Sequence, residues 1–228
     1  ADQTLALTDD PVLLARAHGI KAAPRSDAGY VRHLFDQFSA DYDLRMRQHL
    51  QYAAPEILLA LAGMVMPGRE GLRILDLGCG TGLAGAVFHP LAARLDGIDL
   101  SPAMIGKARA RGLYDHLAVA DLESALAEAG PSYDLILAAD TLVYLGDLGP
   151  VFRAAAGRLS ADGFFLFTVE QADSGFELGP KRRWRHGEAY LRAAAQAAGL
   201  SVAGLLEAAP RQENGQPVAG FAVALTGP

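Results

Sequence analysis

Residues 74–85 read Ile-Leu-Asp-Leu-Gly-Cys-Gly-Thr-Gly-Leu-Ala-Gly, an apolar run that leads through three alternate glycines into a helical stretch. Glycines allow positive φ angles, and they let a ligand approach the backbone without meeting a Cβ atom. In an open α/β sheet, such a turn lies at the carboxyl end of a strand, where ligands bind. The stretch therefore predicts a strand, a ligand-binding loop and a helix in succession.

Around this loop, short apolar runs alternate with alanine-rich amphipathic stretches. The apolar runs cover residues 72–77, 95–100, 116–120, 133–139 and 163–169, and the helical stretches between them cover 82–88, 103–111, 122–129 and 148–159. This alternation predicts a parallel sheet covered by helices on both faces. A further helix over 187–198 precedes runs at 200–208 and 217–225, joined around Asn214-Gly215, which predicts an antiparallel hairpin at the edge of the sheet.

The segment before this alternation is helical in pattern. Apolar residues recur at three- and four-residue spacing from Val31 to Tyr42, which is typical of one face of a helix. A second helix is expected over 55–64, with Pro67 and Gly68 ending it. Three parts are therefore expected: an arm over 1–29, a helical part over 30–66 and an α/β core over 67–228.

The composition excludes several classes of protein. Of the 228 residues, 51% are hydrophobic, which is too many for a disordered chain. The single cysteine cannot form an internal disulfide or a zinc site of several thiolates, so no metal is expected. No apolar run approaches the ~18 residues of a membrane helix, and the first residues lack the pattern of a signal peptide, so a cytoplasmic protein is expected. A net charge of −6 argues against nucleic-acid binding that relies on overall positive charge.

Two cofactor classes fit a glycine loop of this kind. Residues 80–85 satisfy G-x-G-x-x-G, and Asp99 follows at the distance of a ribose-binding acid, so a nicotinamide or flavin oxidoreductase is one interpretation. Asp76 argues against it, because a carboxylate just before the first glycine would repel a pyrophosphate. S-adenosylmethionine carries an ammonium and a sulfonium and no phosphate, so the same acid is complementary to it.

The loop also resembles a known family. Residues 75–82 resemble the first motif of class I S-adenosylmethionine-dependent methyltransferases, and residues 30–43 resemble the leader of the ubiquinone-biosynthesis-type members and of predicted methyltransferases linked to tetratricopeptide repeats. Residues 5–20 resemble the end of such a repeat. The resemblance implies a Rossmann-like seven-stranded, mostly parallel sheet with helices on both faces, an antiparallel C-terminal hairpin and a helical lid over 30–66.

The resemblance also implies cofactor contacts at the ends of three successive strands. Asp76 would lie near the ammonium of S-adenosylmethionine, Asp99 would accept from both ribose hydroxyls, and Asp121 would accept from the adenine amino group. The other implied cofactor contacts are Gly78, Cys79, Gly80 and Gly82 at the methionine moiety, Leu100, Met104 and Leu122 at the adenine, and Tyr30 and Tyr42 from the lid.

Methyl transfer from a sulfonium needs little catalytic machinery. It is an in-line displacement with a neutral leaving group, so the enzyme must chiefly align the reactants and exclude water. A base is needed only for an acceptor that is protonated at neutral pH. Asp140 is the first candidate base and Tyr144 a candidate substrate contact, and the alternative for Asp140 is a helix cap.

The residues after the fourth strand restrict the classes of acceptor molecule that are expected. They lack the Asn/Asp-Pro-Pro-aromatic tetrad of enzymes that methylate base or glutamine nitrogens, and the only cysteine lies in the glycine loop, which excludes cytosine C5 methylation. A small-molecule O, N or C nucleophile is expected, with anionic and phenolic acceptors among the options. A non-catalytic module that binds S-adenosylmethionine is a third interpretation.

One basic cluster stands out in this acidic chain. Residues 181–186 read Lys-Arg-Arg-Trp-Arg-His and precede a helix, where cations oppose the helix dipole. Arg182, Arg183 and Arg185 are therefore candidates for binding an anionic group of the substrate, and a solvated loop is the alternative. By resemblance to the repeat-linked methyltransferases, His186 is a second candidate base. Stacking of single-stranded nucleic acid is the weaker interpretation, given the net charge.

Overall fold

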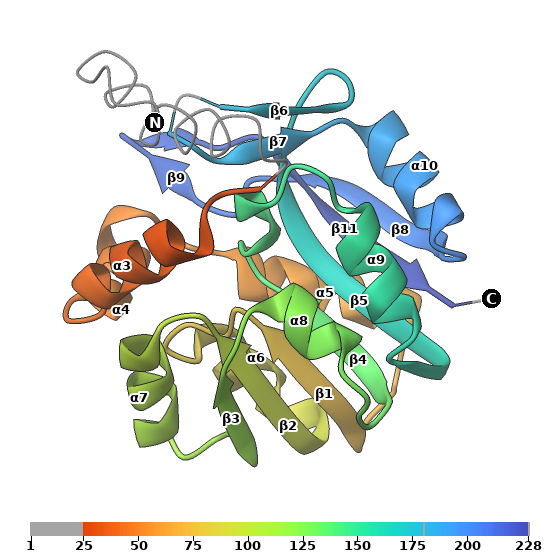
Figure 1. Cartoon of the computed structure of the whole chain (residues 1–228), viewed down its shortest axis with the longest axis horizontal. Helices are drawn as coiled ribbons and strands as arrows, with labels where there is room; N and C mark the ends of the chain where they lie inside the picture. The colour runs from red at the N-terminus through yellow and green to blue at the C-terminus, as the bar shows by residue number, and fades with distance from the viewer. Residues whose placement is uncertain (1–24, 180, 228) are drawn as a thin grey trace, which may run out of the picture.

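The computed structural model describes residues 25–179 and 181–227, and a single large sheet forms its centre (Figure 1). The seven central strands pair in the order β3-β2-β1-β4-β5-β11-β8. Strands β1 to β5 are parallel, and β11 is antiparallel to both β5 and β8. The predicted mostly parallel, Rossmann-like sheet with an antiparallel C-terminal pair is confirmed.

The strands and helices have the following bounds. The central strands are β1 (Leu72–Leu77), β2 (Ala92–Asp99), β3 (His116–Val119), β4 (Tyr133–Ala138), β5 (Leu159–Gln171), β8 (Ser201–Ala208) and β11 (Gly220–Thr226), and the short ones are β6 (Phe176–Leu178), β7 (Trp184–His186), β9 (Gln212–Glu213) and β10 (Gln216–Pro217). The helices are α3 (Ala28–Phe38), α4 (Tyr42–Leu44), α5 (Ala54–Val65), α6 (Leu83–Phe88), α7 (Pro102–Ala110), α8 (Leu122–Ala127), α9 (Gly149–Ala156) and α10 (Glu188–Ala197). Short turns of other helix types are η1 (Arg45–His49), η2 (His89–Leu91) and η3 (Leu142–Tyr144).

The central strands are apolar because both of their faces are buried. Successive side chains of a strand point to opposite faces. In β1, Ile74 packs into a cluster with α5 and α6, whereas Leu75 packs into the cluster on the other face, which includes residues of α9 and α10. The same division occurs in β4, where Leu135 and Ile136 face opposite clusters. Near-continuous apolar runs are what a parallel sheet covered on both faces requires.

Parallel pairing brings the polar strand ends to one edge of the sheet. Asp76 is in register with Gly97 of β2 and with Leu137 of β4. The glycine loop after β1 therefore lies beside Asp99 at the end of β2 and beside Asp140, which follows β4. Residues that are far apart in the sequence form one site because three strands end together.

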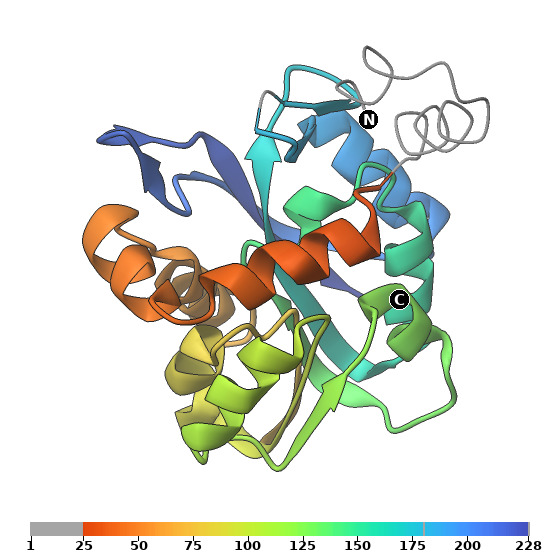
Figure 2. The same ribbon diagram turned by 60° about the vertical axis from the view of Figure 1, so that its left-hand side comes forward.

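The N-terminal helices have two different roles. In Figure 2, α3 is the red-orange helix that lies against α7 near the carboxyl ends of the strands. By contrast, α5 packs on the sheet, with Leu58 and Leu61 fully buried in its core. The lid predicted over 30–66 is therefore too long, because α5 belongs to the helical layer on the sheet; of the segment before α5, Phe35, Tyr42 and Tyr52 lie at the strand ends.

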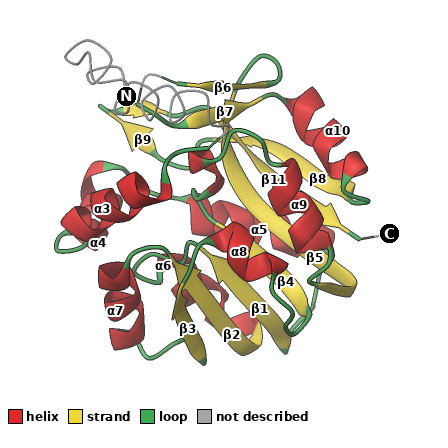
Figure 3. Ribbon diagram, viewed as in Figure 1, coloured by secondary structure: helices red, strands yellow, loops and turns green. Residues whose placement is uncertain are grey.

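The segment after β5 contains two strands that the sequence did not predict (Figure 3). β7 pairs in parallel with β5 and antiparallel with β6, so part of the basic cluster is a strand rather than a loop. Each of these strands has only three residues, too few to show a periodic pattern. Asn214 and Gly215, both at positive φ, form the turn between β9 and β10, so the path between β8 and β11 carries a small hairpin of its own.

Most of the predicted arm over 1–29, including the repeat-like residues 5–20, lies outside the described residues. In the part of the chain that the structure describes, no helix has the length and apolar character needed to span a membrane.

Candidate cofactor and acceptor site

The glycine loop forms the floor of a cavity at the carboxyl ends of β1, β2 and β4. Gly78 has φ +68°, and a Cβ atom there would lie 2.4 Å from Cγ2 of Thr141. A larger residue would therefore push apart the ends of β1 and β4. Gly80 also has a positive φ and lines the cavity, whereas Gly82 is the N-cap of α6 and does not line it.

Asp99 is held in this cavity by two backbone groups. Its Oδ2 accepts from the N–H of Gly80 at 2.9 Å, and its Oδ1 accepts from the N–H of Ser101 at 2.8 Å. Burial raises the pKa of Asp99, and the two N–H donors oppose that rise. Because each carboxylate oxygen can accept more than one hydrogen bond, Asp99 retains capacity for two hydroxyl donors of a ligand.

Two elements cover this cavity. Val31 and Phe35 of α3 and Tyr42 of α4 line it opposite the glycine loop, and Leu100 and Leu122 form an apolar side wall. The cavity has a volume of about 70 Å³, whereas pockets for small molecules span about 300–1,000 Å³. The cavity as it stands therefore holds only part of a molecule of cofactor size.

Polar contacts join the lid, formed by α3 and α4, to the glycine loop. The carboxylate of Asp43 accepts from the hydroxyl of Thr81 in the loop and from the guanidinium of Arg111. A second contact joins Ser101 Oγ to Asp36 Oδ1 at 2.5 Å. The lid is thus tied to the same loop and strand end that form the cavity.

Asp76 does not line the cavity. It is 1% exposed and accepts a 2.7 Å hydrogen bond from the hydroxyl of Tyr114. Burial raises its pKa to about 7, and the bond from Tyr114 opposes that rise. Asp76 thus forms a buried pair with Tyr114 beside the loop, and its predicted place near the ammonium, by direct or water-mediated contact, stays a prediction.

Three further predicted cofactor contacts are placed elsewhere. Met104 is fully buried in α7, so its side chain is core. Tyr30 is 41% exposed, and the guanidinium of Arg182 stacks on its ring. Asp121 caps α8 and pairs with Arg25 at 2.5 Å, which outweighs burial and lowers its pKa. These side chains do not line the cavity; the neighbouring Leu122 does, and Cys79 lines a smaller adjoining one.

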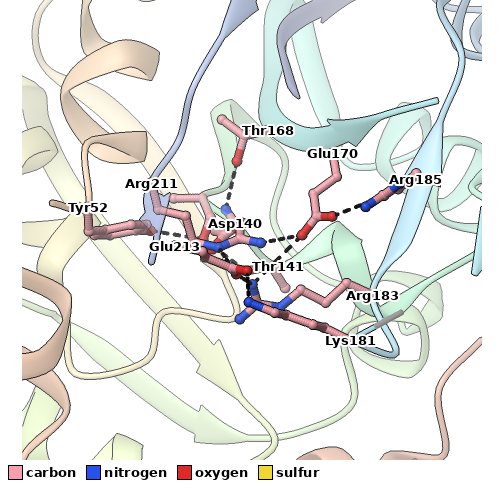
Figure 4. A network of polar contacts seen from close by, with 11 residues as sticks. Tyr52, Asp140, Thr141, Thr168, Glu170, Lys181, Arg183, Arg185, Arg211 and Glu213 are labelled. Carbon is pink, nitrogen blue, oxygen red and sulfur yellow. Dashed lines mark hydrogen bonds and ion pairs between the residues drawn. The ribbon is translucent and has the colours of Figure 1, made fainter. Parts of the chain in front are cut away.

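Asp140 and Tyr144 line the same cavity as Leu100. Asp140 is not the cap of a helix: the turn that follows has no side-chain cap. Instead, its Oδ1 accepts from the guanidinium of Arg211 at 2.5 Å (Figure 4). Burial raises the pKa of Asp140, and the charges of Arg211 and Arg183 oppose that rise.

The basic cluster lines a second cavity of about 340 Å³. Lys181, Arg183 and Arg185 face Glu170 and Glu213 across it, and Figure 4 shows these side chains converging. Lys181 and Arg183 bind Glu213, and Arg185 lies 3.6 Å from Glu170. Despite burial, these cations lower the pKa of Glu213 to about 2. Arg182, predicted with this cluster, points to Tyr30 instead.

His186 is not placed to act as a base. It is fully buried, its Nε2 lies 3.0 Å from the carbonyl oxygen of Gly146, and its ring stacks on Tyr190. Burial lowers its pKa to about 4. It lines neither cavity, so the prediction that it is a second base is wrong, and His186 is a structural residue that joins β7 to the turn after η3.

Several residues of the site carried no recognisable signal in the sequence. Arg211, Glu170 and Glu213 meet Asp140 only through the fold, since Arg211 and Asp140 are 71 positions apart. Phe35 was predicted as part of a helix face; it contacts Tyr42 of α4 and Tyr144 of η3 edge-on. An apolar stripe on a helix does not reveal whether it covers a core or a cavity.

Comparisons with known proteins agree with this geometry. Residues 75–165 match the family model described as a methyltransferase domain. Methyltransferase-like protein 27 of Homo sapiens is 34% identical over 124 residues, 53% of this chain and 48% of that protein. Ubiquinone biosynthesis O-methyltransferase of Xanthomonas oryzae is 33% identical over 113 residues, 47% of each chain. The chain thus spans about half the length of the curated relatives it matches.

Solved structures share the fold. Magnesium protoporphyrin IX methyltransferase from Synechocystis, solved with S-adenosylhomocysteine, has a TM-score of 0.68 at 18% identity and covers 89% of this chain and 100% of its own. The family match favours the methyltransferase interpretation of the glycine loop over the dinucleotide oxidoreductase interpretation. Residues 75–165 therefore match a methyltransferase domain, and the chain has the fold of solved S-adenosylmethionine-dependent methyltransferases.

Proposed function

We propose that this protein transfers the methyl group of S-adenosylmethionine to a small-molecule acceptor. The observation that carries the proposal is Asp99, held by two backbone N–H groups in a cavity whose floor is the glycine loop. A fixed carboxylate is suited to the two hydroxyls of a ribose, and a loop without Cβ atoms admits the methionine moiety.

The cavity walls suggest how the cofactor lies. Its adenine would pack between Leu100 and Leu122, since these are the apolar walls beside Asp99. Its methionine moiety would lie over Gly78 and Gly80, which directs the sulfonium toward Asp140. Phe35 and the rest of the lid would then exclude water from the reacting atoms.

The reaction is a single displacement. The nucleophile of the acceptor forms a bond to the methyl carbon while the carbon–sulfur bond breaks, and its electron pair stays on sulfur as a neutral thioether. If the nucleophile is a hydroxyl, its proton must leave, and Asp140 is the carboxylate that lines the cavity at the sulfonium end. Tyr144, beside it, would position the acceptor.

The acceptor that we propose carries an anionic group. Three cations and two carboxylates line the second cavity, so its walls carry a net positive charge. Arg183 joins the two cavities, because it lies beside the hydroxyl of Tyr144 and also lines the second one. The acceptor in the name of one structural relative, magnesium protoporphyrin IX, is also a small molecule.

Radiolabelled methyl transfer tests the acceptor class. We expect transfer from S-adenosylmethionine to 3,4-dihydroxybenzoate to exceed transfer to catechol, which lacks the carboxylate, by at least about tenfold, the effect of roughly 1.4 kcal/mol. Arg185→Gln should reduce this preference, and Arg192→Gln, on the exposed face of α10, should not. Equal rates with both phenols would contradict an anionic acceptor. Cofactor binding without transfer to either would favour a non-catalytic module.

A further inference from the structure

Arg211 is the most thoroughly enclosed charge at this site, and the proposed reaction does not use it directly. Its side chain is 1% exposed, and it lies on the connection between β8 and β9. Hydrogen bonds hold the backbone on both sides of Arg211. The carbonyl of Pro210 accepts from the N–H of Ala53, and the N–H of Gln212 donates to the carbonyl of Leu50.

All three edges of its guanidinium are occupied by carboxylates (Figure 4). One terminal nitrogen binds Asp140 Oδ1 at 2.5 Å, the other binds Glu170, and Nε donates to Glu213 at 3.1 Å. A planar guanidinium that is bonded through all three of its nitrogens cannot rotate without breaking a hydrogen bond. Glu170 on β5 and Glu213 on β9 therefore fix the orientation of the guanidinium that binds Asp140.

The negative charge of the carboxylates around Arg211 is balanced in part by the cations that line the second cavity. Arg183 binds Glu213 and lies 3.8 Å from Glu170, and Arg185 approaches Glu170 from the other side. A buried guanidinium is tolerated only where its charge is compensated and its donors are satisfied. Glu170 and Glu213 are each shared with these other cations, whereas the ion pair of Asp140 is with Arg211.

The backbone of Asp140 is also constrained. Its φ is +57°, a left-handed conformation that is uncommon for a residue with a side chain, and its N–H donates to Thr168 Oγ1 at 2.8 Å. Such conformations are strained and persist where the surrounding structure imposes them, often at active sites. Thr168 of β5 thus holds the backbone of Asp140, and Arg211 holds its carboxylate.

We propose that Arg211 is a positioning residue that keeps Asp140 ionised and leaves its second oxygen to face the acceptor. Arg211 takes Oδ1, and no other described side chain donates to Oδ2. This inference rests on the proposed function, because it assumes that Asp140 meets the acceptor. The ionisable groups that face Asp140 are Arg211, Arg183, Glu170, Glu213, Tyr42, Tyr52 and Tyr144.

The test is the titration of Asp140 by carbon-13 NMR, with its carboxyl resonance assigned by Asp140→Asn. In Arg211→Met, we expect the titration midpoint of Asp140 to rise by at least about one pH unit, a tenfold change in its ratio of protonated to ionised forms. Arg211→Lys, which keeps the charge, should shift it less. An unchanged midpoint in Arg211→Met would overturn the proposal.

Two controls separate this result from loss of folding and from failure of the proposed function. Arg192→Met removes an exposed arginine and should leave the midpoint unchanged. If Arg211→Met does not fold, Arg211→Met/Glu170→Gln removes one charge of each sign, and a smaller rise in the Asp140 midpoint is expected, because Glu170 also raises the pKa of Asp140. S-adenosylhomocysteine should bind wild type and variants within about twofold. Absence of binding to the wild type would reject the proposed function, whereas an unshifted Asp140 with intact binding would reject the role of Arg211 alone.

Discussion

Asp99 accepts a 2.9 Å hydrogen bond from the backbone N–H of Gly80, which ties the end of β2 to the loop that follows β1. The loop and the carboxylate thus hold each other in place before any ligand arrives. A site that is already assembled loses less freedom when it binds.

Asp99→Ala should weaken binding of S-adenosylhomocysteine at least tenfold. Hydrogen bonds to a charged group are worth about 1.5–3 kcal/mol each, and 1.4 kcal/mol is a factor of ten in Kd. Isothermal titration calorimetry measures the change. Asp173→Ala, at an exposed position, is the control and should bind like wild type. Equal affinity in both variants would contradict a ribose role for Asp99.

Asp43→Ala should accelerate entry of the cofactor. The cavity is too small for it while the lid is closed, and Asp43 joins the lid to Thr81 and Arg111. We expect the association rate of S-adenosylhomocysteine, measured by surface plasmon resonance, to rise about threefold or more, since an exposed ion pair is worth up to about 1 kcal/mol. Asp41→Ala, which removes only a contact with Arg45, should have no effect. A slower or unchanged rate in Asp43→Ala would show that the contact does not limit opening.

Gly85→Ala should destabilise the fold by about 1–3 kcal/mol, the usual cost of overpacking. Its Cβ atom would lie 2.2 Å from the hydroxyl oxygen of Tyr114. The matched substitution Gly106→Ala, where nothing lies within 4 Å, should stabilise its helix by up to about 1 kcal/mol. Urea denaturation gives both values. If Gly85→Ala were as stable as Gly106→Ala, the packing of Tyr114 over α6 would be refuted.

His186 should make stability fall at acidic pH. Its pKa is about 4 in the fold and 6.5 in its ordinary state, because burial opposes the charged form. The unfolded chain therefore binds the proton first, so stability is complete above about pH 6.5 and declines from there toward pH 4. In His186→Gln this decline should be shallower, and in His116→Gln, at an exposed position, it should match wild type. Parallel unfolding curves for wild type and His186→Gln would contradict the burial of this ring.

The sequence predicts most of the fold because its signals are local. The glycine loop, the strand runs and the helices between them all lie within a few residues of where the pattern places them. The contacts of Asp99 and the cavity position of Asp140 follow from the ends of parallel strands, which is a general property of such sheets.

What the sequence did not predict depends on distant contacts. The role of Arg211 arises from carboxylates after β4, on β5 and on β9, and Tyr114 binds Asp76 across 38 positions. His186 was assigned a chemical role from a short local resemblance, whereas its burial is decided by packing against Tyr190 and Gly146. Burial of a polar residue cannot be read from its immediate neighbours in the chain.

The most direct test of the account is calorimetric titration of the protein with S-adenosylhomocysteine and, separately, with NADH. We predict saturable one-to-one binding of S-adenosylhomocysteine and no heat from NADH, since the carboxylate of Asp76 lies beside the loop that a pyrophosphate would have to approach. Saturable binding of NADH with no response to S-adenosylhomocysteine would contradict it.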